Sequence, residues 1–367
     1  MSPAVRTLTL LTPGLLDNAP RTGPPAAPAL ARLLARSDRD PDPCTDQDLA
    51  VLAAFGISVP EDSVAPVAPI TRFLDTGMAD ASCWMRADPV HLAADRDRLL
   101  LADATTVPVD RSEADALIRD IGAALAELDG RLEAPAPTRW YLRTDHCPDM
   151  STSPPRAAAG SDAGSFLPSG PDAAHWSALL NEIQMVLHAS AVNTEREERG
   201  LPAINSLWFW GAGHLPQPRR APWAGVWSDD PVAAGLAGLA RIPAHPLPAG
   251  AQAWLAQAGA PGEHLVLVDG IGTAVRQGGA AAWSALLQAF EREWIVPLVA
   301  ALRARRLDQL RLRPLNGRHY RVDRGALRRF WRRARGLEPH LSETRSSPPA
   351  GAAVGGARRA TMGTAAP

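Results

Sequence analysis

The segment between residues 181 and 214 concentrates side chains that could bind a small anion. Asn193, Arg196 and Asn205 supply amide and guanidinium donors, and Gly211 and Gly213 follow directly on an apolar run. An arginine can bind phosphate or carboxylate through two parallel hydrogen bonds, and backbone N–H groups bared of side chains can turn onto an anion. The pattern predicts an anion site. The same residues are equally explained if the polar side chains only brace loops and the glycines only permit a bend.

An anion site of this kind needs strands that end at one edge of a sheet. The apolar runs at 5–11, 205–210 and 264–269 each end in a loop that contains glycine. Strands that are apolar on both faces are typical of parallel sheets covered by helices, and ligands bind beyond the carboxyl ends of such strands. Helical patterns separate these runs. The sequence therefore predicts an α/β fold, a three-layer core with a mainly parallel sheet.

A second set of strand and helix patterns lies between the first and second halves of the predicted core. We expect an α/β core at 1–78 and 172–340, and an inserted small α+β cap at 79–171. Within the cap, the Ser-, Pro- and Gly-rich stretch 150–170 is expected to be a mobile loop. The tail at 341–367 has a composition typical of disorder.

Charge is distributed unevenly along the chain. The 367 residues carry a formal net charge of −1, which excludes a globally basic nucleic-acid-binding protein. The segment 303–335 nevertheless has 13 arginines and two aspartates. It could bind an acidic protein partner, and nucleic acid is the less favoured partner. A last helix is expected at 324–335, where Phe330 and Trp331 could pack against the core.

The cysteines and the hydropathy pattern bear on location. Three cysteines, Cys44, Cys83 and Cys147, are far apart and form no CxxC motif, which argues against a disulfide framework or a zinc site. No run reaches the roughly 18 apolar residues that a membrane-spanning helix needs, and the N-terminus is typical of a first strand rather than a signal peptide. The pattern favours a cytoplasmic protein without membrane association.

Three short blocks carry a resemblance to a known family. They are Trp84–Leu92, Asn181–Met185 and Asn205–Trp208, the last followed by Trp210-Gly211. Together with the spacing from Asn193 to Gly213, they resemble the archaeal-type cofactor-independent phosphoglycerate mutases of the alkaline phosphatase superfamily. The chain is more closely similar to bacterial RpfE-type regulatory proteins. The resemblance covers about residues 5–335 and implies an alkaline-phosphatase-like core with an inserted cap.

The departures from the mutase pattern concern the two metal ions that such enzymes use to activate phosphate. Pro13 stands where the mutases have the Asp that follows their first strand, and Pro offers no ligand atom. Thr45, in Cys44-Thr45-Asp46, could replace the nucleophile, or it could simply cap a helix. Gln277 or Gly278 replaces a ligand of the late metal motif, so Asp269 is left as a single candidate ligand.

These departures define the function expected from the sequence. We expect a phosphoglycerate-mutase-like pseudoenzyme that lacks the two-metal centre, needs no cofactor, and is regulatory or binds a small phosphorylated or carboxylate metabolite. Arg86 is expected to approach that ligand from the cap, opposite Asn193, Arg196 and Asn205. The alternative is an active phosphoglycerate mutase or phosphatase that uses manganese or zinc, with Thr45 as nucleophile and Asp269 as a ligand.

Overall fold

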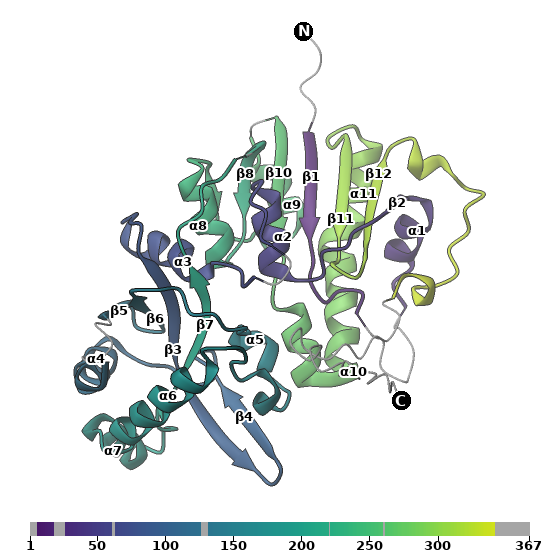
Figure 1. Ribbon diagram of the computed structural model, residues 1–367. Coiled ribbons are helices and arrows are strands. Elements are labelled where there is room, and N and C mark those ends of the chain that lie inside the picture. Colours follow the sequence, from purple (N-terminus) through teal and green to yellow (C-terminus); the bar gives the residue numbers. More distant parts are fainter. Residues whose placement is uncertain are drawn as a thin grey trace, which may run out of the picture.

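The computed structural model describes residues 6–17, 26–60, 63–125, 131–219, 221–259 and 261–341, without the side chains of 123–124 and 273–280. Two separate sheets organise these residues, one in an α/β core and one in a cap (Figure 1). The chain begins in the core, passes through the cap, and returns to the core. The expected α/β class with an inserted cap is confirmed.

The core sheet has seven strands in the order β2-β12-β11-β1-β10-β8-β9. Its centre is parallel: β1 pairs with β10 and β11, and β10 pairs with β8. The strands β12 and β2 run antiparallel at one edge. The bounds are β1 Arg6–Leu11, β2 Asp38–Pro41, β8 Trp223–Trp227, β9 Ala244–His245, β10 Gly262–Leu267, β11 Gln309–Arg313 and β12 Arg318–Asp323.

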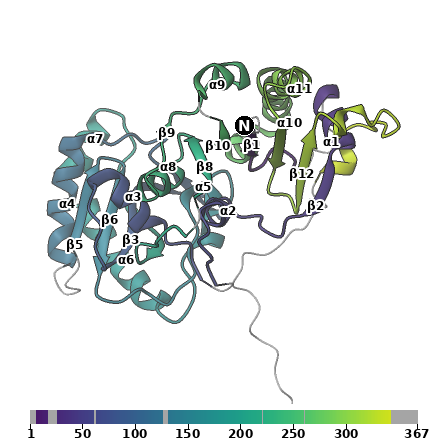
Figure 2. The ribbon, with the colours of Figure 1, turned by 90° about the horizontal axis from the view of Figure 1, so that it is seen from above.

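Helices cover both faces of this sheet, which makes three layers (Figures 1 and 2). Leu8, Leu10 and Val266 pack on one face, whereas Leu11 and Leu267 pack on the other, as the alternation of side chains along a strand requires. The first face is covered by α1 Pro28–Arg36, α9 Ala251–Gln257, α10 Ile271–Phe290 and α11 Val296–Arg303. The second is covered by α2 Gln47–Ala54, α3 Val67–Thr76 and α8 Pro231–Leu239.

Local sequence explains several boundaries in the core. Asp46 and Asp230 are the N-caps of α2 and α8, and their carboxylates accept hydrogen bonds from backbone N–H groups of the first turn. A π-helical turn, Glu291–Ile295, separates α10 from α11 close to Pro297, because proline lacks an N–H group. The Asn316-Gly317 turn joins β11 and β12, and Gly317 has a positive φ of 87°.

The cap is built on a second, antiparallel sheet. The strands run in the order β4-β3-β6-β5, and β7 pairs with β3 as well. Their bounds are β3 Cys83–Asp95, β4 Arg98–Ala102, β5 Arg131–Ala136, β6 Arg139–Thr144 and β7 Ser206–Gly213. The helices are α4 Arg111–Leu125, α5 Pro155–Ala158, α6 Ala173–His188 and α7 Ala191–Glu198. Residues from α4 and α6 share a hydrophobic core with β3, β6 and β7.

The expected end of the cap at residue 171 is wrong. The strand at 205–210 belongs to β7, which runs antiparallel to β3 in the cap and is not part of the core sheet. Leu207 and Phe209 pack into the cap core, while Trp208 and Trp210 pack against α2, α3 and α8 of the core. A strand between two packed layers is apolar on both faces, so its sequence resembles that of a central parallel strand.

Two further expectations about irregular segments need correction. The stretch 150–170 contains α5, a short 3-10 helix at Ala163–Phe166, and a bridge between Ser151 and Ser169. The helix expected at 324–335 is limited to a single 3-10 turn, Ala326–Arg328, and Phe330 and Trp331 are 76% and 66% exposed rather than packed. Of the expected disordered tail, 342–367 lies outside the described residues.

Within the described ranges, no helix combines the length and the apolar character that crossing a bilayer requires.

Candidate functional site

A cleft of about 690 Å³ lies between the carboxyl ends of the core strands and the cap. On the core side it is lined by the loops after β1 and β10 and by the first residues of α2 and α8. The cap contributes β3, β6, β7 and α5. The position agrees with the rule that α/β sheets bind ligands beyond the carboxyl ends of their parallel strands.

Aspartates dominate the core wall of the cleft. Asp46, Asp230 and Asp269 line it. Asp46 and Asp230 are the N-caps of α2 and α8, and Asp269 lies in the loop after β10. Burial raises the pKa of all three carboxyl groups, and the neighbouring charge of Asp48 adds to the rise for Asp46 and Asp230. The pKa of Asp230 is raised to about 6. The core wall alone therefore stabilises the ionised form of these carboxyl groups only in part.

Asp230 is held in place on both of its carboxylate oxygens. Oδ1 accepts hydrogen bonds from the backbone N–H groups of Val232 and Ala233, each at 2.9 Å. Oδ2 accepts from Nε2 of Gln47 at 3.0 Å. These bonds favour the ionised form and partly offset the effect of burial. Asp230 thus joins the start of α8 to the start of α2 across the cleft floor.

Arg156, which α5 carries from the cap segment, is the cation whose charge acts on these three carboxylates. Its Nη2 donates to Oδ2 of Asp48, a buried residue whose other oxygen makes no hydrogen bond with the described residues. Burial raises the pKa of Asp46, Asp230 and Asp269, and the charge of Arg156 offsets part of this rise. One guanidinium thus compensates four aspartates, and it links the cap segment to α2 of the core.

Two more arginines face the cleft from the cap. Arg86 donates through Nε and Nη2 to Asp88 at 2.9 and 2.6 Å, and its guanidinium lies over Tyr141 and Trp210. Arg139 forms a bidentate pair with Asp75, a residue of α3. The cap side of the cleft therefore carries three arginines opposite the aspartates of the core.

Three of the residues expected at the anion site lie elsewhere. Asn193 is buried and binds the backbone of Leu187 and Ile204, and Asn205 pairs with both backbone groups of Leu92 at 2.8 Å. Arg196 is 1% exposed and forms an ion pair with Glu113 at 2.7 Å. Their expected place in the cleft is wrong. These side chains brace the connection between α7 and β7, which was the alternative interpretation of the sequence.

The glycines of the expected site serve close packing. Gly211 has a φ of 65°, and a Cβ atom added there would approach Val67 to 3.0 Å. A Cβ atom on Gly213 would approach Pro66 to 2.6 Å. Both positions lie where β7 meets the start of α3, so the absence of side chains lets the cap rest against the core. Of the predicted ligand-binding residues, Arg86 lines the cleft, as do the weaker candidates Thr45 and Asp269.

Comparison with known proteins relates this arrangement to one group of enzymes. A probable 2,3-bisphosphoglycerate-independent phosphoglycerate mutase of Geobacter sulfurreducens is 26% identical over 174 residues, which cover 46% of this chain and 43% of the relative. The corresponding enzyme of Methanosarcina mazei is 35% identical over 69 residues, 19% of this chain and 17% of the relative. Part of the chain is thus similar in sequence to phosphoglycerate mutases. The chain matches less than half the length of either relative, and no family model matches it.

The fold is shared with a solved structure as well. The PH0037 protein from Pyrococcus horikoshii superposes with a TM-score of 0.54 over 87% of this chain and 88% of that one, at 13% identity. The phosphoglycerate-mutase-like chain thus has an alkaline-phosphatase-like core, as the resemblance implied.

The described residues of this cleft do not fit a pair of metal ions. No three His, Cys, Asp or Glu residues of the described part are grouped so that they could hold a metal. Both oxygens of Asp230 are already bonded, Asp48 is paired with Arg156, and Pro13 lines the cleft at the end of β1. Gln277 and Gly278 lie in α10, and their side chains are outside the described part. The guanidinium of Arg156 pairs with Asp48, and its charge acts on Asp46, Asp230 and Asp269.

Thr45 lies in the cleft without being the cap of α2. Its neighbour Asp46 is the N-cap and accepts a hydrogen bond from the backbone N–H of Leu49 at 2.9 Å. Thr45 is exposed, and its hydroxyl makes no hydrogen bond with the described residues. The capping explanation for Thr45 is therefore wrong, and its candidacy as a nucleophile stays untested.

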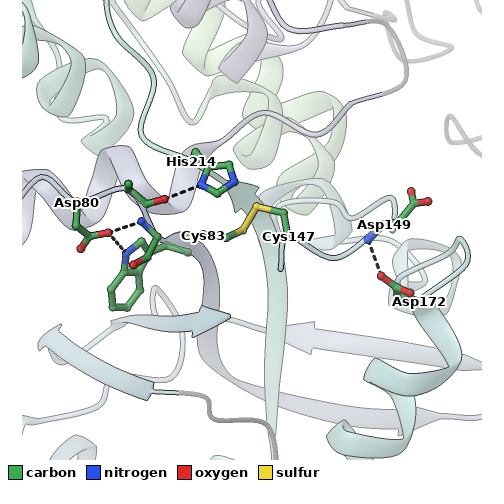
Figure 3. Close-up of a disulfide and its surroundings, with 9 residues drawn as sticks. Asp80, Cys83, Cys147, Asp149, Asp172 and His214 are labelled. Atoms are coloured by element: carbon green, nitrogen blue, oxygen red, sulfur yellow. Dashed lines mark hydrogen bonds between the residues drawn. A yellow bond between two sulfur atoms is a disulfide. The ribbon is translucent and has the colours of Figure 1, made fainter. Parts of the chain in front are cut away.

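The cysteines contradict the sequence expectation. Cys83 and Cys147 form a disulfide with a Cα–Cα distance of 5.5 Å, and Cys44 is the free cysteine (Figure 3). The two residues are 64 positions apart, but β3 and β6 pair so that Cys83 lies opposite Thr144, three residues before Cys147. The strand pairing is the feature that brings the two cysteines together, and their separation along the sequence does not reveal it.

Sequence reasoning also missed Arg156, Arg139 and Asp230. Arg156 stands in the Ser- and Pro-rich stretch that was expected to be mobile, where a single arginine has no distinguishing neighbours. Asp230, by contrast, has a readable signal: Asp230-Pro231 before an apolar helical run is typical of an N-cap followed by proline in the first turn.

Proposed function

We propose that this phosphoglycerate-mutase-like protein binds a small phosphorylated or carboxylate metabolite in the cleft without the two-metal chemistry of the mutases. The observation that carries the proposal is the polarity of the cleft. Arg86, Arg139 and Arg156 line it from the cap, and aspartates line it from the core. An anionic group of the ligand would bind the arginines, and its hydroxyl groups would donate to the aspartates.

The group that neutralises the cleft carboxylates supports the loss of phosphoryl transfer. In a two-metal site, divalent cations neutralise the carboxylates and stabilise the attacking and leaving oxygens. Here Arg156 neutralises them, and a guanidinium cannot act as a metal does because it offers N–H groups and no vacant coordination position. A regulatory or binding role is therefore favoured over an active mutase.

Three finer assignments are part of the same proposal. We infer an RpfE-type regulatory group from the blocks around Trp84, Asn181 and Asn205, and a cytoplasmic location from the hydropathy pattern. We also infer an acidic protein partner for the segment 303–335. Exchange of Arg328, Arg333 and Arg335 for glutamine should then lower the salt concentration at which an acidic resin releases the protein.

Exchange of Arg139 for glutamine tests the ligand site. Arg139 pairs with the buried Asp75, and 32% of its side chain is exposed, so its loss should destabilise the fold about as much as the loss of Arg156, and binding is compared on the folded proteins. We expect 3-phosphoglycerate to stabilise the natural protein in a thermal-shift titration. Its Kd should rise about tenfold or more in Arg139→Gln, because a charge-assisted hydrogen bond contributes about 1.5–3 kcal/mol.

The matched control is Arg143→Gln, on the same strand but outside the cleft lining. It should bind like the natural protein. If no phosphorylated or carboxylate metabolite shifts the melting temperature, or if the two variants bind equally, the proposed site is wrong.

A further inference from the structure

The Cys83–Cys147 disulfide joins a rigid part of the cap to a loosely held one. Cys83 is 2% exposed and lies in β3, next to Trp84, which pairs with both β6 and β7. Cys147 is exposed and lies in the loop after β6. Figure 3 shows the bond beside the end of the cap sheet, with the loop continuing toward Asp149 and Asp172. One sulfur is therefore open to an external thiol, and the other is sheltered.

Little else holds the start of this loop. Among the described residues, 145–148 make no hydrogen bond or ion pair apart from the disulfide. The next attachment is the N–H of Asp149, which donates to Asp172 at 2.7 Å, and Ser151 and Ser169 form a two-bond bridge. Both attachments connect two parts of the segment 145–172 with each other and not with the cap sheet. The segment's connections to the cap near this end include the disulfide, the side chain of Met150, which is buried in the cap core, and the carbonyl of Ser153, which accepts from Trp208.

The same loop continues directly into the cleft. Residues 152–157 line it, and Arg156 extends from there to Asp48 on α2. The disulfide is thus nine residues away from the guanidinium that compensates the core aspartates. A change in the order of residues 145–154 would reach Arg156 along the chain, past the buried Met150 and the Ser153 carbonyl.

We propose that the Cys83–Cys147 disulfide is a reversible redox site that controls the order of the segment carrying Arg156. The inference rests on the proposed function, because it concerns regulation of the same cleft. A thiolate of a dithiol reductant attacks Sγ of the exposed Cys147; the S–S bond breaks, and its electron pair leaves on Sγ of Cys83, which takes a proton. The second thiol of the reductant then displaces Cys147, which is released as a thiol, and the reductant becomes a disulfide.

Reduction is expected to loosen the segment without unfolding the chain. In cytoplasmic proteins disulfides are mostly transient or redox-sensing, which agrees with the proposed location. The hydrogen-bonded amides of Asp149, Ser151 and Ala157 report on the segment. After reduction they should exchange with deuterium about tenfold faster or more, since the local opening free energy falls, whereas amides in β1 and β10 should not change.

Two measurements test this inference on the full chain. Thiol titration of the unfolded protein without reductant should give one thiol, Cys44, and three after reduction. Peptide-resolved hydrogen exchange should then show the faster exchange in reduced protein and in Cys83→Ser with or without reductant. Cys44→Ser is the matched control and should respond to reductant like the natural chain.

Three titratable thiols in protein purified without reductant would overturn the inference. Exchange of the 149–157 amides that differs less than twofold between the two redox states would overturn it as well. Neither readout involves a ligand, so a protein that binds no metabolite yet shows the exchange response would contradict the proposed function and leave the redox site standing. If the Cys83→Ser protein fails to fold, reduction of the natural chain still decides.

Discussion

Exchange of Arg196 for alanine is expected to lower the free energy of unfolding by about 3–5 kcal/mol. Arg196 is fully buried, pairs with Glu113 at 2.7 Å, and donates to the carbonyls of Pro202 and Pro108. Its removal leaves the largely buried carboxylate of Glu113 and two carbonyl groups without these partners. Urea denaturation at pH 7 measures the loss.

The matched control uses the same carboxylate. Arg199 lies 3.4 Å from Glu113, but 58% of its side chain is exposed, so Arg199→Ala should cost less than about 1 kcal/mol. Because Arg196 lies away from the cleft, the folded fraction of Arg196→Ala should retain its response to 3-phosphoglycerate. A stable Arg196→Ala protein that no longer responds to the ligand would contradict the bracing role and revive the anion site.

Exchange of Arg156 for glutamine should destabilise the protein by about 2–3 kcal/mol at pH 7.5, a value below that for a fully buried pair because 30% of the side chain is exposed. The loss should be smaller at pH 4.5. Arg156 offsets part of the rise that burial causes in the pKa of Asp46, Asp230 and Asp269, so its removal raises these pKa values further. At pH 4.5 Asp230, whose pKa is about 6, is protonated and no longer needs the cation.

The sign of this pH dependence follows from Asp230. Its pKa is raised to about 6 in the folded protein, from about 4 in the unfolded chain, so the folded state binds more protons between these values. Stability contributed by the protonated carboxyl is present below about pH 4 and is lost as the pH rises through 6. Urea denaturation at several pH values should show that the free energy of unfolding falls more steeply with rising pH in Arg156→Gln than in the natural protein. The slope of Arg156→Lys should lie between the two. Equal losses at pH 4.5 and 7.5 would show that Arg156 does not compensate these carboxylates.

The α/β class was predictable because β1 and β10 carry apolar side chains on both faces and end in glycine-containing loops. The cap boundary was not, since β7 is covered on both faces in the cap much as a central strand would be in the core. Periodicity reports burial and says nothing about which layer buries a strand. The partner strand β3, 120 residues earlier, decides the placement.

The site was predictable only in part, for a related reason. Arg86 and Asp269 were found because resemblance and strand ends point to them, and both line the cleft. Asn193 and Asn205 have the residue types of a ligand site, but their amides pair with backbone groups of Ile204 and Leu92, which lie beyond the end of the β3–β7 pairing. A side-chain amide can donate to a ligand or to a backbone carbonyl in the same way, so the residue type does not show which of the two partners it binds. Arg156 gains its role entirely from tertiary contact with Asp48.

The central claim is that a guanidinium, and not a pair of divalent cations, compensates the aspartates of this phosphoglycerate-mutase-like cleft. Atomic spectroscopy of the full chain after dialysis against manganese, followed by removal of free metal, tests it most directly, with turnover of 3-phosphoglycerate measured on the same sample. The prediction is well under one manganese ion per chain and no mutase activity. Two manganese ions per chain together with conversion of 3-phosphoglycerate would contradict it.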